Sequence, residues 1–386
     1  MEENSLEEPS FPFANVTNDS SGWELMEKYK QNQKVSETAL ATLACCYALL
    51  ILVGSLGNAL VVLTVARKRA MRTPRNLFIF NLAVSDLFLC LFTMPFTLYQ
   101  VTTMIWNLGW FPCKLVGFMQ ATSIFVSTLT ITAIALDRCY VITNPTREGL
   151  MVPGVLMVMG VIWLAAITLA SPLFVFQNLI SFEFNIENYP KHIQFCFEDW
   201  PITRGRAMYS IFSFVFQYII PIATVSTAYT QIYFKLQGRL GTGILKESSQ
   251  ARQEREDIRI RRTNKLLLSI ALIFCVSWLP LNLFNLFVDL FNPFEDKQEE
   301  QAIIFAVCHM LGMSSACFNP LLYGWLNENF QREFLEVFAL LPCRKRRPRE
   351  NNVQEPRAEE IEISDRQEVL RNDVHRSEPE RLPLKT

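Results

Sequence analysis

Within the apolar run from Cys113 to Ile142, the spacing of three polar residues brings them to one side of a helix. Gln120, Ser127 and Arg138 share a face when successive residues turn by about 100°. A helix rising about 1.5 Å per residue carries Arg138 about 37 Å from Cys113, a little more than a hydrocarbon core of about 30 Å. Polar groups are costly in hydrocarbon, so this face is expected to point into a protein interior. The chemistry it offers is hydrogen bonding near one end and ion pairing at the other.

A second candidate is Asp86, an acid in the middle of an apolar stretch. A carboxylate at that depth needs a partner. Ser127, Ser315 and Asn319 lie at matching depths in their own stretches, so they could complete a small polar cavity around it. A network of structural water molecules is one way to fill such a cavity.

Seven apolar stretches position these residues. The 386-residue chain is 50% hydrophobic, contains 30 Phe, and concentrates its charge at its ends and in short loops. That distribution predicts a polytopic helical membrane protein, not a large soluble core. The predicted fold class is all-α, with seven transmembrane helices. The stretches cover residues 39–66, 75–100, 111–142, 152–175, 207–236, 263–290 and 301–325.

Basic residues mark one side of the predicted membrane. Arg67, Lys68 and Arg69 follow the first stretch, and a basic cluster lies between the fifth and sixth, whereas the opposite loops are richer in acids. Because Lys and Arg favour the cytoplasmic side, we predict a plasma-membrane protein with its N-terminus outside and its C-terminus inside. Residues 1–38 would form an extracellular arm without an apolar signal-peptide core. N-glycosylation patterns occur there at Asn15 and Asn18.

The chain changes character after the bundle, which is expected to cover 39–325. Phe330, Phe334 and Phe338 recur at intervals of four, which predicts a short amphipathic eighth helix within 326–343, on the inner membrane face. Cys343 adjoins a basic run and is a candidate for palmitoylation, with a free thiol as the alternative. Residues 344–386 are polar and charged, which is typical of a disordered cytoplasmic tail.

Motifs in successive stretches give a more specific signal. They are Gly57-Asn58, Leu82 to Asp86, Asp137-Arg138-Cys139, Trp163, Pro221 with Tyr229, Phe274 to Pro280, and Asn319 to Tyr323. In this order, one set per stretch, they resemble the rhodopsin-like (class A) G-protein-coupled receptors over residues 39–343. The resemblance implies a seven-helix bundle whose Arg138 end faces a G protein. It also implies an activation switch formed by Asp137, Arg138, Tyr229, Phe274, Trp278, Pro280, Asn319, Pro320 and Tyr323.

The same resemblance implies two further features. Cys113 is expected to pair with Cys196 and to tether the second outer loop, which in relatives with peptide ligands often forms a hairpin. No cofactor is expected apart from an allosteric sodium ion. In similar receptors that ion binds in the polar cavity, here Asp86, Ser127, Ser315 and Asn319.

The inner end departs from the family pattern at two places. Cys139 replaces the tyrosine usual in its motif, and Ile260, Arg261 and Arg262 occupy a place where many relatives carry an acid. A salt bridge between the third and sixth helices is therefore not expected to close the inner face. We predict a weak resting lock and some basal activity.

The residues of the outer part of the bundle restrict the class of ligand that the protein can bind. Gln120 stands where amine receptors carry an aspartate, so an ammonium ligand would lack a counter-ion, and the seventh stretch has no lysine for retinal. The polar residues of this region resemble those of the neuropeptide Y and neuropeptide F receptor group, as does the run from Gly324 to Phe330. The candidate ligand-binding residues are Thr97, Gln120, Gln217, Asn282, Asn285, Asp289 and His309.

The ligands of that group imply a role for these residues. A peptide ending in Arg-aromatic-amide would place its arginine at Asp289 and its carboxamide among the amide side chains deeper in. Simpler explanations exist for single residues: a solvated helix-end charge at Asp289, a packing role for His309, and helix–helix hydrogen bonds for Gln120 and Gln217. Their combination favours a peptide pocket.

The predicted protein is a receptor and not an enzyme. Its ligand would be an amidated neuropeptide of the Arg-Phe-amide or Arg-Tyr-amide type, and its transducer a Gi/o protein. Arrestin and membrane lipid are further expected partners, and nucleic acid is not. A receptor for another peptide class, such as tachykinin-like ligands, is the main alternative. A seven-helix transporter would need paired ionisable groups, inverted repeats or a retinal lysine, and the sequence has none of these.

Overall fold

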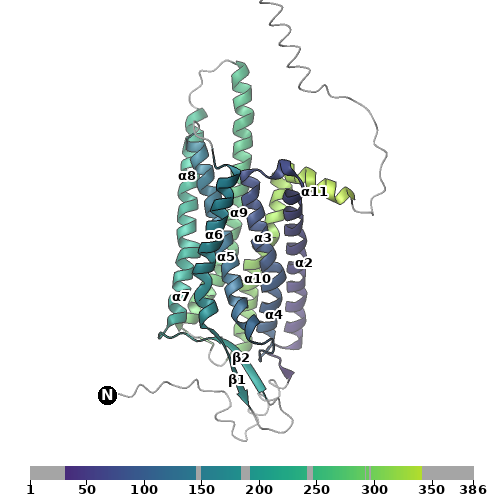
Figure 1. Cartoon of the computed structure of the whole chain (residues 1–386), viewed down its shortest axis with the longest axis vertical. Helices are drawn as coiled ribbons and strands as arrows, with labels where there is room; N and C mark the ends of the chain where they lie inside the picture. Colours follow the sequence, from purple (N-terminus) through teal and green to yellow (C-terminus); the bar gives the residue numbers. More distant parts are fainter. Residues whose placement is uncertain are drawn as a thin grey trace, which may run out of the picture. The chain divides into compact units, whose positions relative to one another are not determined.

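The structure, a computed structural model, describes residues 31–144, 149–183, 192–240, 247–291, 293–294 and 297–340. The predictions at Asn15, Asn18, Cys343 and the 344–386 tail lie outside these residues. The described chain up to Phe338 belongs to one compact unit. Within it, seven helices are long and apolar enough to cross a membrane. They run side by side, which confirms the predicted fold class (Figure 1).

The spanning helices begin and end close to the predicted positions. The exception is the sixth, whose described helix starts well before the apolar stretch. In chain order the spans are α2 (Glu37–Arg67); α3 (Pro74–Phe88), η2 (Leu89–Thr93) and α4 (Met94–Thr102) joined end to end; α5 (Trp110–Thr143); α6 (Val152–Phe176); α7 (Gly205–Phe214), η3 (Val215–Ile219) and α8 (Ile220–Leu240) joined likewise; α9 (Glu247–Phe291); and α10 (Gln298–Leu326).

Prolines shape five of these spanning helices. The π-helical turns η2 and η3 lie just before Pro95 and Pro221. Proline has no N–H for the carbonyl one turn back, so the regular hydrogen-bond ladder is interrupted there. Pro172, Pro280 and Pro320 lie inside α6, α9 and α10. All five sites are therefore places where the hydrogen-bond ladder of a spanning helix is interrupted.

A glycine allows α2 to pack closely on α10. A Cβ added at Gly57 would lie 2.9 Å from side-chain carbons of Pro320, so a larger residue would force the helices apart. The next residue, Asn58, is fully buried. Its amide donates to the carbonyl oxygens of Gly54 and Ala316, each at 2.9 Å. Because a buried amide must be hydrogen-bonded, this residue fixes the depth at which the two helices meet.

A second buried amide joins three helices. The Asn81 amide in α3 donates to the Thr130 hydroxyl in α5 at 2.8 Å, and its oxygen accepts from the Trp163 indole in α6 at 2.9 Å. These contacts account for the tryptophan in the largely apolar helix α6. They also fix how α5, which carries the polar face predicted above, sits beside α3.

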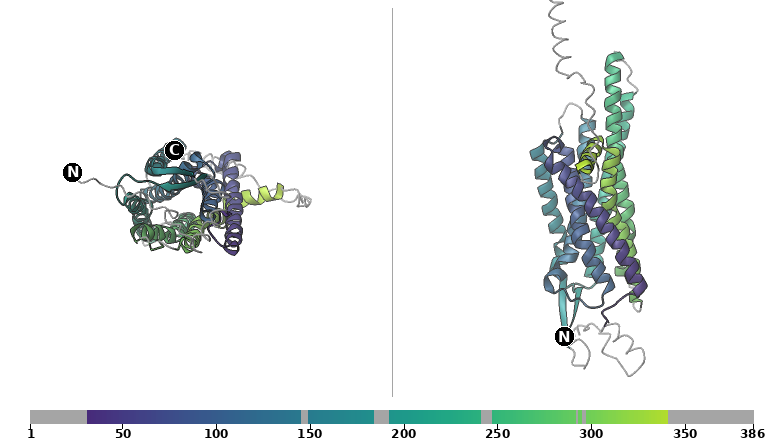
Figure 2. Two further views of the ribbon diagram at one scale, coloured as in Figure 1. Left: turned by 90° about the horizontal axis from the view of Figure 1, so that it is seen from below. Right: turned by 90° about the vertical axis from the view of Figure 1, so that its right-hand side faces the viewer.

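The hairpin crosses one end of the bundle. Strand β1 (Gln177–Glu183) pairs antiparallel with β2 (His192–Glu198), and Leu179 lies opposite Cys196. Figure 2 shows the helices arranged in a ring with these strands across it. We call this the hairpin end of the bundle, and the predicted hairpin is confirmed.

The opposite end carries α11 (Glu328–Leu340), which starts after a single non-helical residue and turns away from the bundle (Figure 1). We call it the α11 end. Phe330 and Phe334 are buried there, and Phe330 packs on Tyr323 with ring centroids 5.7 Å apart. Lys68 forms ion pairs with Glu333 at 2.5 Å and Glu336 at 2.7 Å. The amphipathic pattern therefore docks α11 against the bundle.

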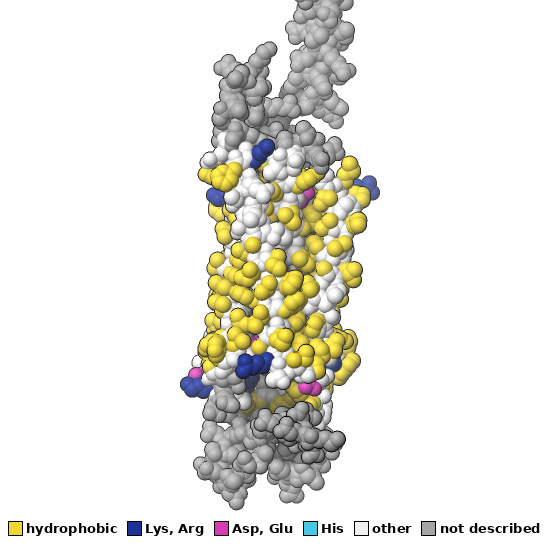
Figure 3. All heavy atoms as spheres, turned by 90° about the vertical axis from the view of Figure 1, so that its left-hand side faces the viewer, with side chains coloured by type: hydrophobic (Ala, Val, Ile, Leu, Met, Phe, Trp, Pro, Cys, Tyr) yellow, Lys and Arg dark blue, Asp and Glu magenta, His cyan; other side chains and the backbone are white. Residues whose placement is uncertain are grey.

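Apolar side chains dominate the middle of the bundle surface. Figure 3 shows them spread over one face, with Lys, Arg, Asp and Glu gathered near the two ends. A surface of this kind suits a hydrocarbon layer between two aqueous boundaries.

Candidate functional site

A cavity of about 380 Å³ opens at the hairpin end, between the helices and beneath the strands. Its wall includes five of the seven predicted ligand residues: Gln120 from α5, Gln217 from η3, and Asn282, Asn285 and Asp289 from α9. Amide side chains thus line the cavity from two sides. They can both donate and accept hydrogen bonds, which suits a ligand with peptide or carboxamide groups.

Thr97 and His309 are not on this wall. His309 is fully buried, accepts or donates a hydrogen bond of 2.9 Å with the Tyr47 hydroxyl, and stacks between the rings of Tyr47 and Phe305. Thr97 is also buried, with 3% of its surface exposed. The surroundings of His309 agree with the simpler explanation, that this residue has a packing role. The sequence misplaces both because depth alone does not say which side of a helix faces the cavity.

Asp289 is paired before any ligand arrives. Its side chain is 4% exposed, and one carboxylate oxygen lies 2.8 Å from Nε of Arg206 in α7. The Ser210 hydroxyl donates to the other oxygen. The alternative of a solvated helix-end charge is therefore inconsistent with the structure. A buried carboxylate requires such partners, because desolvation without them is expensive.

Arg206 links this acid to the hairpin. Its Nε lies 3.9 Å from a carboxylate oxygen of Glu198, the last residue of β2. Glu198 in turn accepts a hydrogen bond of 2.9 Å from the Trp200 indole. Neither Arg206 nor Glu198 was singled out from the sequence as a candidate site residue. The available signal was the spacing of Arg206 and Ser210, which a helix places on one face.

Lys34 also lines the cavity, from the segment before α2. Its backbone N–H donates to the Thr102 carbonyl at 2.8 Å. Burial lowers the pKa of its ammonium from the ordinary value of 10.5. The cavity mouth therefore holds both signs of charge, with the acids on the side of α9 and β2.

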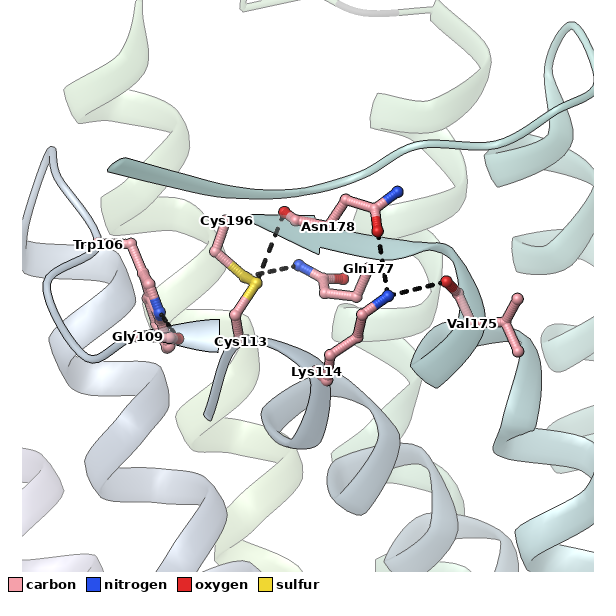
Figure 4. The surroundings of a disulfide bond; sticks show 8 residues. All are labelled: Trp106, Gly109, Cys113, Lys114, Val175, Gln177, Asn178 and Cys196. Atoms are coloured by element: carbon pink, nitrogen blue, oxygen red, sulfur yellow. Dashed lines mark hydrogen bonds between the residues drawn. A yellow bond between two sulfur atoms is a disulfide. The ribbon is translucent and has the colours of Figure 1, made fainter. Parts of the chain in front are cut away.

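The hairpin is fixed by a disulfide and a buried lysine (Figure 4). Cys113 at the start of α5 is bonded to Cys196 in β2, which confirms the expected pair. The neighbouring Lys114 donates to the Val175 carbonyl and to the Asn178 side chain, both at 3.0 Å. The strands are thus held over the cavity by two adjacent residues of one helix, and Lys114 was not singled out from the sequence.

The floor of the cavity connects to the middle of the bundle. Trp278 lines the cavity, is 2% exposed, and packs on Phe274 one turn away with ring centroids 5.9 Å apart. Its indole donates to the Ser315 hydroxyl at 3.2 Å. A Cβ at Gly312 would lie 3.1 Å from the Trp278 ring, so the small residue allows α10 to approach it.

The predicted polar cavity is only partly assembled around Asp86. The Asn319 amide donates to the Asp86 carboxylate at 2.8 Å. Ser127 instead shares a hydrogen bond of 2.8 Å with Ser85, and Ser315 bonds to Trp278 as described. The four side chains do supply carboxylate, hydroxyl and amide oxygens, the donors that hard cations prefer.

The remaining switch residues lie toward the α11 end. Arg138 forms an ion pair with Asp137, whose side chain is 5% exposed. The Cys139 thiol donates to the Gln231 side chain at 3.2 Å. Among the side chains that the structure describes, no ion pair joins Arg138 to α9. This agrees with the departure from the family pattern noted in the sequence.

These features together define a membrane receptor of seven helices, with a ligand-sized cavity at one end and a charged switch at the other. A profile of the "7 transmembrane receptor (rhodopsin family)" matches residues 57–323. The Drosophila melanogaster neuropeptide F receptor is 47% identical over 321 residues, which cover 82% of this chain and 66% of that receptor. The Homo sapiens neuropeptide Y receptor type 2 is 35% identical over 299 residues, 77% of this chain and 76% of its own length.

A putative neuropeptide Y receptor 11 of Caenorhabditis elegans is likewise 35% identical over 310 residues. The chain therefore belongs to the rhodopsin family, within the group of neuropeptide Y and neuropeptide F receptors.

Proposed function

We propose that this chain is a G-protein-coupled receptor for an amidated neuropeptide of the Arg-Phe-amide or Arg-Tyr-amide type, with Gi/o as its transducer. One observation carries the proposal: Asp289, a buried acid at the mouth of an amide-lined cavity, already holds an arginine side chain, that of Arg206. The site is therefore built to bind a guanidinium, and a bidentate arginine–carboxylate contact is among the strong charge-assisted ones.

The geometry supports a stepwise mechanism that begins at Asp289. The peptide's arginine replaces Arg206 on Asp289, and its carboxamide bonds with Gln120 and Gln217. The aromatic end presses on Trp278, the floor of the cavity. A ligand shifts the conformational equilibrium only by binding one state better, and here the state favoured is one with Trp278 displaced.

Displacement of Trp278 is transmitted along α9. Phe274 moves with it, and the helix swings at Pro280. Arg138 then leaves Asp137 and becomes available to Tyr229, Tyr323 or a G-protein α-subunit. Because no described ion pair joins Arg138 to α9, we expect this step to be easy and basal activity to be measurable.

The proposed orientation places the hairpin end outside the cell and the α11 end in the cytoplasm, at the plasma membrane. The disulfide supports it, because such bonds form in oxidising compartments. N-glycosylation at Asn15 and Asn18, palmitoylation at Cys343 and binding of arrestin follow from the same orientation. We also propose that sodium binds at Asp86 in the resting receptor, with the hydroxyls of Ser127 and Ser315 turned toward the ion.

A double-mutant cycle tests the arginine contact. Peptide agonists carrying arginine or its neutral analogue citrulline are titrated against wild type and Asp289→Asn. Losing a buried charge pair costs about 3 kcal/mol, so we expect about a 100-fold loss of potency for the arginine peptide. For the citrulline peptide the same substitution should cost less than about threefold. Equal losses for both peptides would refute the contact.

Glu300→Gln is the matched control. Glu300 is an exposed acid at the same end of the bundle, paired with Lys297 at 3.3 Å, and it does not line the cavity. Its removal should leave the potency of both peptides unchanged.

A panel of amidated peptides that includes tachykinin-type sequences tests the ligand class and the Gi/o assignment together. The measurement is inhibition of cAMP production with and without pertussis toxin.

A further inference from the structure

A second cavity lies at the α11 end, between α8 and α9. Its volume is about 350 Å³. Tyr233 and Gln237 line it from α8, and Arg261, Asn264, Lys265 and Leu268 line it from α9. Tyr229, one of the predicted switch residues, and Ile232 complete the lining from α8, and none of the eight residues lines the cavity at the hairpin end.

The polar groups of this cavity are mainly hydrogen-bond donors. Arg261 and Lys265 are exposed, and neither forms an ion pair with a described side chain. Asn264 is 8% exposed, and its amide nitrogen has no hydrogen-bond partner. Gln237 donates to the Tyr233 oxygen at 2.6 Å, which leaves the hydroxyl proton free to donate onward.

Two cations and an unpaired buried donor describe a site for an anion. A buried donor without a partner is unfavourable, so it is expected to meet an acceptor in the functional state. Lys and Arg supply charge, and the flat guanidinium matches phosphate geometry. The cavity therefore fits a phosphate or carboxylate group.

The position of the cavity relative to the membrane indicates which kind of anion it binds. The apolar stretch predicted from the sequence for the fifth span ends at residue 236, and that for the sixth begins at residue 263. The cavity thus lies where lipid headgroups meet the hydrocarbon layer. Directly along α9 from Lys265, an exposed apolar stripe continues toward the middle of the bundle, with exposed fractions of 37% at Leu268, 56% at Leu272 and 70% at Val276.

We propose that this cavity binds the headgroup phosphate of an anionic phospholipid, whose acyl chain lies along the Leu268–Val276 stripe. The phosphate accepts hydrogen bonds from Arg261, Lys265 and the Asn264 amide. A lipid in this position contacts α8 and α9 at once. It therefore favours the arrangement of these helices in which the cavity exists, independently of which peptide the receptor recognises.

Native mass spectrometry of the purified, delipidated full chain tests the proposal. The probes are phosphatidylserine and phosphatidylcholine, added separately. We expect the wild type to retain one phosphatidylserine in preference to phosphatidylcholine. Arg261→Gln and Lys265→Gln should each weaken retention about fivefold, the effect of one basic residue at an anionic surface, and together about 25-fold. Because both side chains are exposed, the variants should fold, and unchanged peptide affinity checks this.

Lys235→Gln is the matched control, since Lys235 is an exposed base on the same stretch of α8 but does not line the cavity. Lipid retention that is equal in all variants, or lost equally in the control, would overturn the proposal.

Two further probes distinguish a phospholipid from other anionic occupants of the cavity. Inorganic phosphate binding as tightly as the lipid would make this a soluble-anion site. Weaker binding of a Gα C-terminal peptide with lipid retention unchanged would assign the cavity to the transducer. Either result contradicts a lipid site.

Discussion

The two ends of the bundle hold cavities of similar size, about 380 Å³ at the hairpin end and about 350 Å³ at the α11 end, but their charges are arranged differently. At the hairpin end the decisive charge, Asp289, is buried and already paired with Arg206. At the α11 end Arg261 and Lys265 are exposed and pair with no described side chain.

The difference follows from burial. A carboxylate that is 4% exposed must be neutralised within the protein, because isolated buried charge is very unfavourable. Exposed bases can be neutralised by water and by whatever anion the surroundings offer. The hairpin end is therefore specific, since an incoming ligand must supply a guanidinium better placed than Arg206. The α11 end selects by charge and depth alone.

The largest effect should come from removing the disulfide that holds the hairpin over its cavity. Replacing Cys113 and Cys196 together with Ser releases a cross-link that closes a loop of 83 residues, worth about 4 kcal/mol in the chain-entropy account. We expect a lower Tm and loss of peptide binding, with lipid retention at the α11 end preserved in the protein that remains folded.

Cys45→Ser serves as the control for that substitution, because Cys45 is exposed and not disulfide-bonded. If the double variant binds peptide as the wild type does, the hairpin is not needed to shape the hairpin-end site. The contrast between a specific hairpin end and an α11 end that selects by charge and depth then fails.

A smaller effect is expected from adding an acid to α9 at the α11 end. Ile260→Glu places a carboxylate at one of the positions where the family resemblance leads us to expect one, and a cross-helix pair with Arg138 of about 1 kcal/mol would lower the active fraction about fivefold. Basal cAMP inhibition is the measurement, in cells expressing equal amounts of receptor at the surface. Wild-type basal signalling no higher than that of untransfected cells would contradict the weak lock.

Removing Arg206, which competes with the peptide's arginine for Asp289, should raise agonist potency slightly. Arg206 is 59% exposed, so its pair with Asp289 is worth at most about 1 kcal/mol after solvent screening. Arg206→Gln should therefore raise the potency of an arginine peptide by up to about fivefold and leave a citrulline peptide unchanged. A loss of potency for the arginine peptide would mean that Arg206 contacts the ligand itself and does not compete with it.

The smallest effect is expected at the junction of α11. The carboxylates of Glu333 and Glu336 raise the pKa of Lys68 above its ordinary value of 10.5. A raised pKa contributes stability that is present below the ordinary value and is lost only as the pH rises through the higher one. Lys68→Gln should therefore lower the Tm by less than about 2 °C, and by the same amount at pH 6 and pH 9. A difference that grows between these pH values would point to another titrating group.

Sequence reasoning located the spans from local signals, whereas the disulfide and the candidate residues of the hairpin-end cavity came from the family resemblance. Runs of about 20 apolar residues determine where a helix can cross hydrocarbon, and helical spacing places Gln120, Ser127 and Arg138 on one face. Cys113 and Cys196, the pair that the resemblance implied, are bonded. Helical periodicity also predicted an amphipathic helix in the segment that forms α11.

Tertiary structure alone decided which side chains meet. His309 and Asn285 lie at comparable depths in neighbouring spans, yet one stacks between Tyr47 and Phe305 while the other faces the cavity. The rotation of each helix about its axis depends on packing against partners far away in the chain, as for Gly57 against Pro320. For the same reason the pairing of Arg206 with Asp289, and the donor-lined cavity between α8 and α9, became visible only when the helices were placed side by side.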